Sequence, residues 1–246
     1  MTTYTLELEI DPKSLRIIKA AQLKVTLAKP VNAISEHPNV AWVVFDPFQG
    51  NTVSWEEEYS IYASATPITQ NGAVISRITE AEFPASDATY YTLNHSATFA
   101  GPFTGSDAPG KGSYKVNNAM PSTQYPFLTF GLEQEASING SGIKPSPLNA
   151  AVVPAALSAT FTPLTTVYVW LQAQFTSGTV ITQVNGHASI VTFGGNIQKH
   201  TLAYNPDTGT FIPSSKSVPV ESLRANYMDF ETQDTGFRHF RRPGVH

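Results

Sequence analysis

The chain of 246 residues contains no cysteine. Disulfide bonds, thiolate metal sites and cysteine nucleophiles are therefore excluded. The absence fits a reducing compartment, although it does not exclude secretion.

Charged residues are also scarce. They make up 14% of the chain, and 15 Lys and Arg stand against 19 Asp and Glu, which gives a formal net charge of −4. Because this field is weak and slightly negative, the composition disfavours nucleic acid as a partner. Hydrophobic residues reach 41%, which predicts a folded protein and not a disordered polymer.

Long apolar runs are missing as well. Nowhere do 18 consecutive apolar residues occur, so the sequence predicts no transmembrane segment. The N-terminus has no basic stretch followed by an apolar block, so we expect a soluble protein made in the cytosol without a signal peptide. The final location, including release from the cell, stays open.

Motifs of catalysis and metal binding are absent too. The segment GSDAPGKGS (105–113) has the spacing of a phosphate-binding loop, but Gly112 stands where Ser or Thr is required and no helix follows. The six histidines form no short-range pair that would place two rings on one face. We therefore predict no metal, no cofactor and no catalytic residue.

What the chain does contain is a series of short β-patterned segments. Residues 4–10 alternate between apolar and polar side chains, as in a half-buried strand. Asp11 followed by Pro12 is typical of a helix start and predicts one short helix within residues 11–22. Three Asn-Gly pairs (71–72, 139–140 and 185–186) and NPDTG (205–209) predict turns. The predicted fold is an all-β, antiparallel β-sandwich.

Two domain organisations fit this pattern. The favoured one has two tandem sandwich modules, 1–100 and 127–220, with a Gly/Pro/Ser-rich linker at 101–126 and a C-terminal tail at 221–246. The alternative is one large sandwich or barrel, in which 101–126 is a long loop. Internal similarity at two competing offsets leaves a duplication open.

Three consecutive glutamates stand out in NTVSWEEEYSIYA (51–63). If residues 52–62 form one strand, alternation places Glu57 on the apolar face beside Trp55 and Tyr59, and sends Glu56 and Glu58 to solvent. A bulge among the glutamates would exchange these faces.

Glu57 needs a partner, because an uncompensated carboxylate on an apolar face costs several kcal/mol. A protein partner would be an arginine such as Arg77, or a tyrosine hydroxyl. A ligand partner would be a sugar or a cationic head group, for which aromatic rings beside a carboxylate are suited. We therefore predict a ligand-binding site that comprises Trp42, Trp55, Glu57 and Tyr59.

A basic cluster closes the chain in GFRHFRRPGVH (236–246). Arg238, Arg241 and Arg242 alternate with aromatic residues and are candidates for contact with an anionic partner or a membrane head group. The alternative is a solvated tail, or an arm that packs on a neighbouring subunit.

Three functions follow. The preferred hypothesis is a non-enzymatic binding protein, lectin-like or of the membrane-active defence or toxin type, that recognises a carbohydrate or a lipid head group. The second is a hydrolase with Glu57 as general acid or base and a second carboxylate, among Asp46, Glu80, Glu82 and Glu133, at about 5–10 Å. The third is a structural, self-assembling β protein, for which a homo-oligomer is expected.

Overall fold

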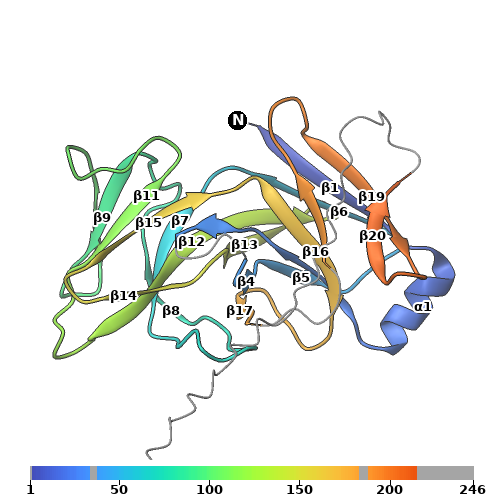
Figure 1. The fold of residues 1–246 in the computed structure, drawn as a ribbon, viewed down its shortest axis with the longest axis horizontal. Coiled ribbons are helices and arrows are strands. Elements are labelled where there is room, and N and C mark those ends of the chain that lie inside the picture. The colour runs from blue at the N-terminus through green and yellow to red at the C-terminus, as the bar shows by residue number, and fades with distance from the viewer. Residues whose placement is uncertain (1, 34–37, 183–187, 215–246) are drawn as a thin grey trace, which may run out of the picture.

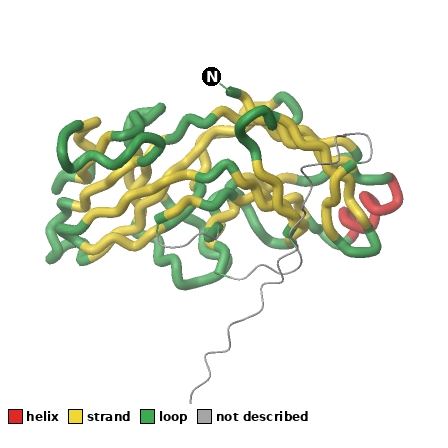
Figure 2. The backbone as a smooth tube through the Cα atoms, turned by 45° about the horizontal axis from the view of Figure 1, so that its top comes forward, coloured by secondary structure: helices red, strands yellow, loops and turns green. Residues whose placement is uncertain are grey.

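The computed structural model describes residues 2–33, 38–182 and 188–214. Strands dominate this part of the chain, and α1 (Pro12–Ala20) is its one helix. Figures 1 and 2 show an elongated molecule with α1 at one end of the longest axis. The predicted all-β class and single short helix are confirmed, and none of the sheets in the described ranges closes into a barrel.

The helix begins where the sequence predicts. The Asp11 carboxylate accepts hydrogen bonds from the backbone N–H groups of Lys13 and Ser14, at 2.9 and 3.0 Å. This caps N–H groups that have no partner inside the helix. Ile18 anchors the helix in the core, whereas Ile17 faces solvent.

The largest sheet has nine strands and is built around β12, the longest strand. One edge of β12 pairs with both β6 and β7, and the other edge pairs with both β13 and β14. The members are β1 (Thr3–Glu9), β6 (Gly50–Glu56), β7 (Ser60–Ser64), β8 (Arg77–Glu80), β12 (Phe127–Ile138), β13 (Ser141–Pro147), β14 (Ala151–Pro154), β19 (Lys199–Asn205) and β20 (Thr210–Pro213).

Three smaller sheets complete the fold. The five-stranded sheet contains β3 (Val31–Asn32), β9 (Thr89–Leu93), β10 (Phe99–Phe103), β11 (Tyr114–Asn118) and β15 (Ser158–Pro163). The four-stranded sheet contains β2 (Lys24–Ala28), β5 (Val43–Phe45), β16 (Thr166–Gln172) and β18 (Ser189–Thr192). The two-stranded sheet contains β4 (Val40–Ala41) and β17 (Thr179–Val180).

One main core cluster joins the large sheet to the five- and four-stranded sheets, as in a sandwich. Inward-facing residues of β1 and β12 pack in the same cluster as residues of β2, β11, β15 and β16. Members from these strands include Leu6, Leu8, Val25, Leu27, Val116, Leu128, Phe130, Phe161 and Val169. Most pairs are antiparallel, but β1–β19 and β9–β11 are parallel.

Strands from the two predicted modules share sheets. Strand β1 pairs with β19, β2 pairs with β16, and β12 pairs with β6 and β7. The predicted linker at 101–126 holds β11 and the end of β10. Division into two folding units at this segment stays a prediction, while the main core cluster draws residues from both ranges.

The structure has a turn at each of the three predicted sites that it describes. Asn71 and Gly72 lie in a turn closed by the Ala73 N–H and the Gln70 carbonyl at 3.2 Å, with Gly72 at φ 86°. Asn139 and Gly140 connect β12 to β13 with φ of 51° and 82°, the positive values of a tight hairpin turn. Residues 205–209 connect β19 to β20, with Gly209 at φ 71°. The Asn-Gly pair at 185–186 lies outside the described residues.

Candidate functional site

The three glutamates lie at an irregularity in the large sheet. Strand β12 pairs with β7 up to Glu133 opposite Ser60, and with β6 from Ser137 opposite Ser54. Residues 55–59 therefore face only residues 134–136, so the β6–β7 side carries two extra residues. On its other edge, β12 changes register against β13 at the same level. Bulges of this kind are frequent beside functional sites because they redirect side chains.

The prediction of one continuous strand over 52–62 is wrong at 57–59, where the chain leaves the strand geometry. Because the bulge adds an even number of residues, odd-numbered side chains point inward on both sides of it, and even-numbered side chains point outward. Trp55 and Tyr59 both remain buried, as the alternation predicts. The faces are therefore not exchanged.

The partners of the Glu57 carboxylate are side chains of the protein itself. Its Oε1 atom accepts hydrogen bonds from the Lys29 ammonium at 2.9 Å and from the Trp55 indole N–H at 2.8 Å. Its Oε2 atom accepts a hydrogen bond from the Tyr59 hydroxyl. The expected tyrosine hydroxyl is thus confirmed as a partner, and both carboxylate oxygens are occupied.

The expected arginine partner is wrong. Arg77 pairs instead with Glu80 at 3.0 Å and with the buried Glu133 at 2.6 Å. Arg77 pairs with Glu133 and not with Glu57 because Arg77 lies in β8, at the edge of the sheet, and Glu133 lies nearby in β12. The ion-pair partner of Glu57 is Lys29, which directly follows β2.

Lys29 has no exposed surface, and aromatic rings surround it. Its Nζ atom lies 5.3 Å from the ring centroid of Trp42 and 5.5 Å from those of Trp55 and Tyr59, distances typical of cation–π contact. Nζ also donates to Gln134 Oε1 at 2.9 Å. We call this set, Lys29, Trp42, Trp55, Glu57, Tyr59 and Gln134, the lysine cage.

The four residues predicted as a ligand site thus do converge in space, around a cation that the chain itself supplies. Trp42 is fully buried, and its indole N–H donates to the Gln134 carbonyl at 3.1 Å. Binding of an external ligand by these four residues stays a prediction.

Burial and pairing act in opposite directions on the pKa values of Glu57 and Lys29. Burial by itself would raise the pKa of Glu57, but the Lys29 ammonium and the donors of Tyr59 and Trp55 hold that pKa below its ordinary value. Burial lowers the pKa of Lys29, and Glu57 opposes this shift. Burial also raises the pKa of Tyr59, and the neighbouring Glu57 adds to that effect.

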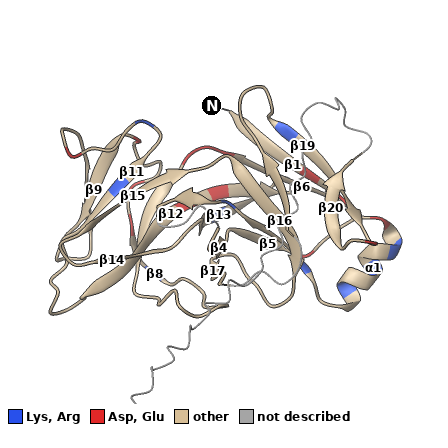
Figure 3. Ribbon diagram, in the orientation of Figure 1, with Lys and Arg blue, Asp and Glu red and all other residues tan. Residues whose placement is uncertain are grey.

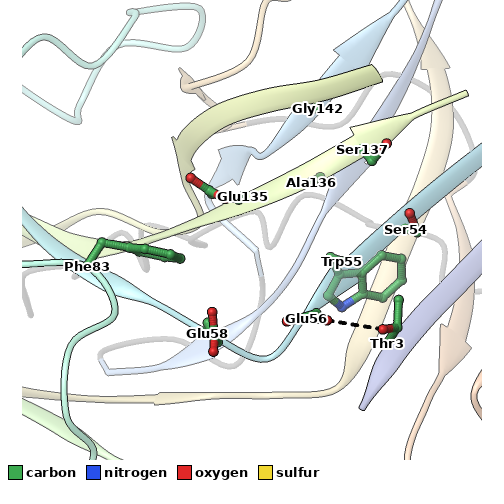
Figure 4. A pocket seen from close by; sticks show the side chains of 10 residues that line it. All are labelled: Thr3, Ser54, Trp55, Glu56, Glu58, Phe83, Glu135, Ala136, Ser137 and Gly142. Carbon is green, nitrogen blue, oxygen red and sulfur yellow. Dashed lines mark hydrogen bonds between the residues drawn. The ribbon is translucent and has the colours of Figure 1, made fainter. Parts of the chain in front are cut away.

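On the outer face of the same bulge lies an open groove of about 300 Å³. Figure 4 shows it, with the ring of Phe83 directed toward the space between Glu58 and Glu135. We call it the acidic groove; it is lined by Thr3, Ser54, Trp55, Glu56, Glu58, Phe83, Glu135, Ala136, Ser137 and Gly142.

The three carboxylates of the groove are poorly compensated. Glu56 accepts a hydrogen bond from the Thr3 hydroxyl at 3.3 Å. Within residues 2–33, 38–182 and 188–214, no Lys or Arg forms an ion pair with Glu56, Glu58 or Glu135. No group of acidic or histidine side chains in these ranges is arranged to hold a metal ion.

Sequence reasoning missed Lys29, Phe83 and Glu135. A signal for Lys29 was available, because Val25, Leu27 and Lys29 share one parity and the first two face the core. Phe83 and Glu135 carried no comparable signal. The pairing of β12 with β6 and β7 brings Glu135 beside the glutamates, and backbone hydrogen bonds from Ala81 and Ala85 hold the segment that contains Phe83.

Several other predicted positions do not join the site. The second carboxylates considered for a hydrolase include Glu80 and Glu133, which are bound to Arg77. Arg238, Arg241 and Arg242 lie outside the described residues.

None of the helices in the described part of the chain is long and apolar enough to cross a membrane.

The lysine cage predicts a pH dependence of stability. Because the pKa of Glu57 is lowered by folding, its contribution is present above its ordinary value of 4.5 and is lost as the pH falls through the folded-state pKa. We expect the difference in free energy of unfolding between wild type and Glu57→Gln to shrink below about pH 4. Urea titrations across the acidic range measure it, and a difference that stays constant contradicts it.

The chain matches no model of a known protein family, no curated protein and no solved structure in comparisons with each.

Proposed function

We propose that this chain is a non-enzymatic, lectin-like binding protein that takes a carbohydrate in the acidic groove. The observation that supports the proposal is the combination of a partly exposed aromatic ring, Phe83, with three carboxylates that lack a cationic partner in the described structure. Carboxylates accept hydrogen bonds from sugar hydroxyls, and an aromatic ring packs against the C–H face of a sugar.

The hydroxyl groups at the rim extend this chemistry. Ser54, Ser137 and Thr3 line the groove and can donate or accept hydrogen bonds. Beneath them, the lysine cage fixes the bulge from the core side, because Gln134 donates to the Glu56 carbonyl at 2.6 Å and accepts from Lys29. A fixed floor lowers the entropy cost of ordering the site when a ligand binds.

A cationic head group is the second candidate ligand. Its support is the uncompensated negative charge of Glu56, Glu58 and Glu135, because an ammonium group beside carboxylates and an aromatic ring gains both charge pairing and cation–π contact. Binding that weakens steeply with added salt would favour this candidate over a neutral sugar.

The two other functions receive less support. A general acid must hold a proton near neutral pH, whereas contacts with Lys29, Trp55 and Tyr59 keep Glu57 ionised and occupy both of its oxygens. The hydrolase hypothesis gains nothing from these contacts. Self-assembly, like the expected homo-oligomer, stays a prediction.

A glycan array followed by calorimetric titration tests the proposal. We expect Glu135→Gln and Phe83→Ala each to weaken binding of the selected glycan about tenfold or more, because each removes a direct contact. Matched controls are Asp207→Asn, an exposed carboxylate in a turn of the described chain, and Phe103→Ala, an exposed ring in β10. No binding on the array, or equal affinity in all four variants, contradicts the proposal.

A further inference from the structure

Charge is distributed unevenly along the chain. No Asp, Glu, Lys or Arg occurs from Val116 to Leu132, or from Pro145 to Gln198. These stretches supply the start of β12 and all of β14, which pair with each other at the end of the molecule opposite α1 (Figures 1 and 3). That end is therefore free of charged side chains along both strands.

Large apolar side chains are exposed at this end. Phe127 is 58% exposed, Val152 is 39% exposed and Leu157 is 57% exposed. Phe127 pairs with Pro154, and Val152 lies on the same outward face two residues earlier in β14. Leu157 follows in a turn closed by its own N–H and the Pro154 carbonyl at 3.1 Å. We call Phe127, Val152, Pro154 and Leu157 the apolar tip.

The groove and the loop that border the tip are polar but neutral. A second groove, of about 500 Å³, is lined by Leu157 together with Asn117, Met120 and Ser158. The exposed loop before Phe127, residues 121–126, contains only proline, hydroxyl, amide and tyrosine side chains. Apolar anchors without charged neighbours can pass through the head-group region into the edge of the acyl chains, and a charged side chain carried into the acyl region would oppose this step.

The size of the tip argues against another folded protein as its occupant. A stable interface between proteins buries about 800 Å² on each partner. The tip offers only the exposed parts of four side chains, and the groove and loop that border it carry no charge with which to orient a partner. Insertion into lipid has no such minimum area, because its strength scales with the apolar surface that enters the bilayer.

We propose that the apolar tip docks the protein on the surface of a lipid bilayer by inserting Phe127 and Leu157 into the head-group boundary. The inference does not depend on carbohydrate binding, because Phe127 and Ser137 lie at opposite ends of β12, about 30 Å apart along the strand. Docking by the tip leaves the acidic groove clear of the bilayer.

Co-sedimentation of the full chain with phosphatidylcholine vesicles tests the docking. We expect binding that hardly changes with salt, since no charge is involved, and a partition coefficient that falls about tenfold or more in Phe127→Ser/Leu157→Ser. The matched control is Ile17→Ser, which removes a side chain that is 62% exposed at the opposite end of the molecule. This control is expected to bind as wild type does.

A fluorescent reporter gives an independent readout. The three native tryptophans, Trp42, Trp55 and Trp170, are all buried. Phe127→Trp therefore adds an exposed indole at the tip, whose emission is expected to shift to the blue on addition of vesicles. The proposal is overturned if wild type does not sediment, if the double variant binds equally, if the control loses binding as much, or if the emission is unchanged. It is also overturned if the double variant abolishes a dimer seen in solution, because the tip would then bind a second copy.

Discussion

Glu57→Gln is expected to lower the free energy of unfolding by about 3 kcal/mol, because it leaves the Lys29 ammonium buried without a counter-charge. Lys29 has no exposed surface, while the Glu57 side chain is 26% exposed, so the cost falls mainly on the lysine. Trp55 and Tyr59 also lose the carboxylate that accepts their hydrogen bonds. Chemical denaturation at neutral pH measures the loss.

A second substitution, at Lys29, tests whether the unpaired ammonium causes the loss of stability. Lys29→Met replaces the cation with an apolar side chain of similar length, and Met fills irregular spaces well. Adding it to Glu57→Gln is expected to restore stability to within about 1–2 kcal/mol of wild type, because no unpaired charge then remains buried. Glu58→Gln, which changes a neighbouring carboxylate of the outer face, serves as the control. Equal losses in Glu57→Gln and Glu58→Gln would exclude the ion pair as the cause.

Gly131→Ala is the second change for which we expect a large loss, of about 3 kcal/mol or more. A Cβ atom at this position would lie 2.0 Å from the backbone oxygen of Asn149 and 2.8 Å from the Tyr62 ring. Neither neighbour can easily retreat. Tyr62 donates its hydroxyl proton to that same Asn149 oxygen at 2.5 Å, and the Asn149 side chain accepts from the Leu132 N–H at 2.9 Å.

Thermal and urea unfolding of Gly131→Ala measure the effect. Gly110→Ala is the matched control, because a Cβ atom there meets nothing within 4 Å. The control is expected to change the free energy of unfolding by no more than about 0.5 kcal/mol. A Gly131→Ala variant as stable as the control would show that β12 can shift away from Asn149, contrary to the packing described.

The local part of the fold was open to prediction from the sequence. Asp11 and Pro12 mark the helix start, Asn139-Gly140 marks the hairpin, and alternation identifies Leu6 and Leu8 as inward-facing. Each of these features depends on interactions between residues only a few positions apart, which is why a short stretch of sequence contains the information.

In the candidate site, too, the features set by near neighbours in the chain could be predicted, and those set by distant residues could not. Alternation correctly assigns Glu57 to the inner face and Glu56 to the outer face, since both statements need only the strand period. The identity of the partner did not follow, because Lys29 and Gln134 are separated from Glu57 by 28 and 77 positions of the chain. The choice of Arg77 was equally compatible with the sequence until β8 was placed at the sheet edge.

By itself, the sequence determined the all-β class, the short helix, the turns and the absence of any thiol chemistry, because composition and near neighbours decide these properties. Only the tertiary structure decided that strands from both halves share sheets, that two extra residues open the sheet at Glu57, and that Phe83 and Glu135 meet at the resulting groove. Strand pairing joins residues that are distant in the chain, and the alternation of a single strand does not specify which other strand will lie beside it.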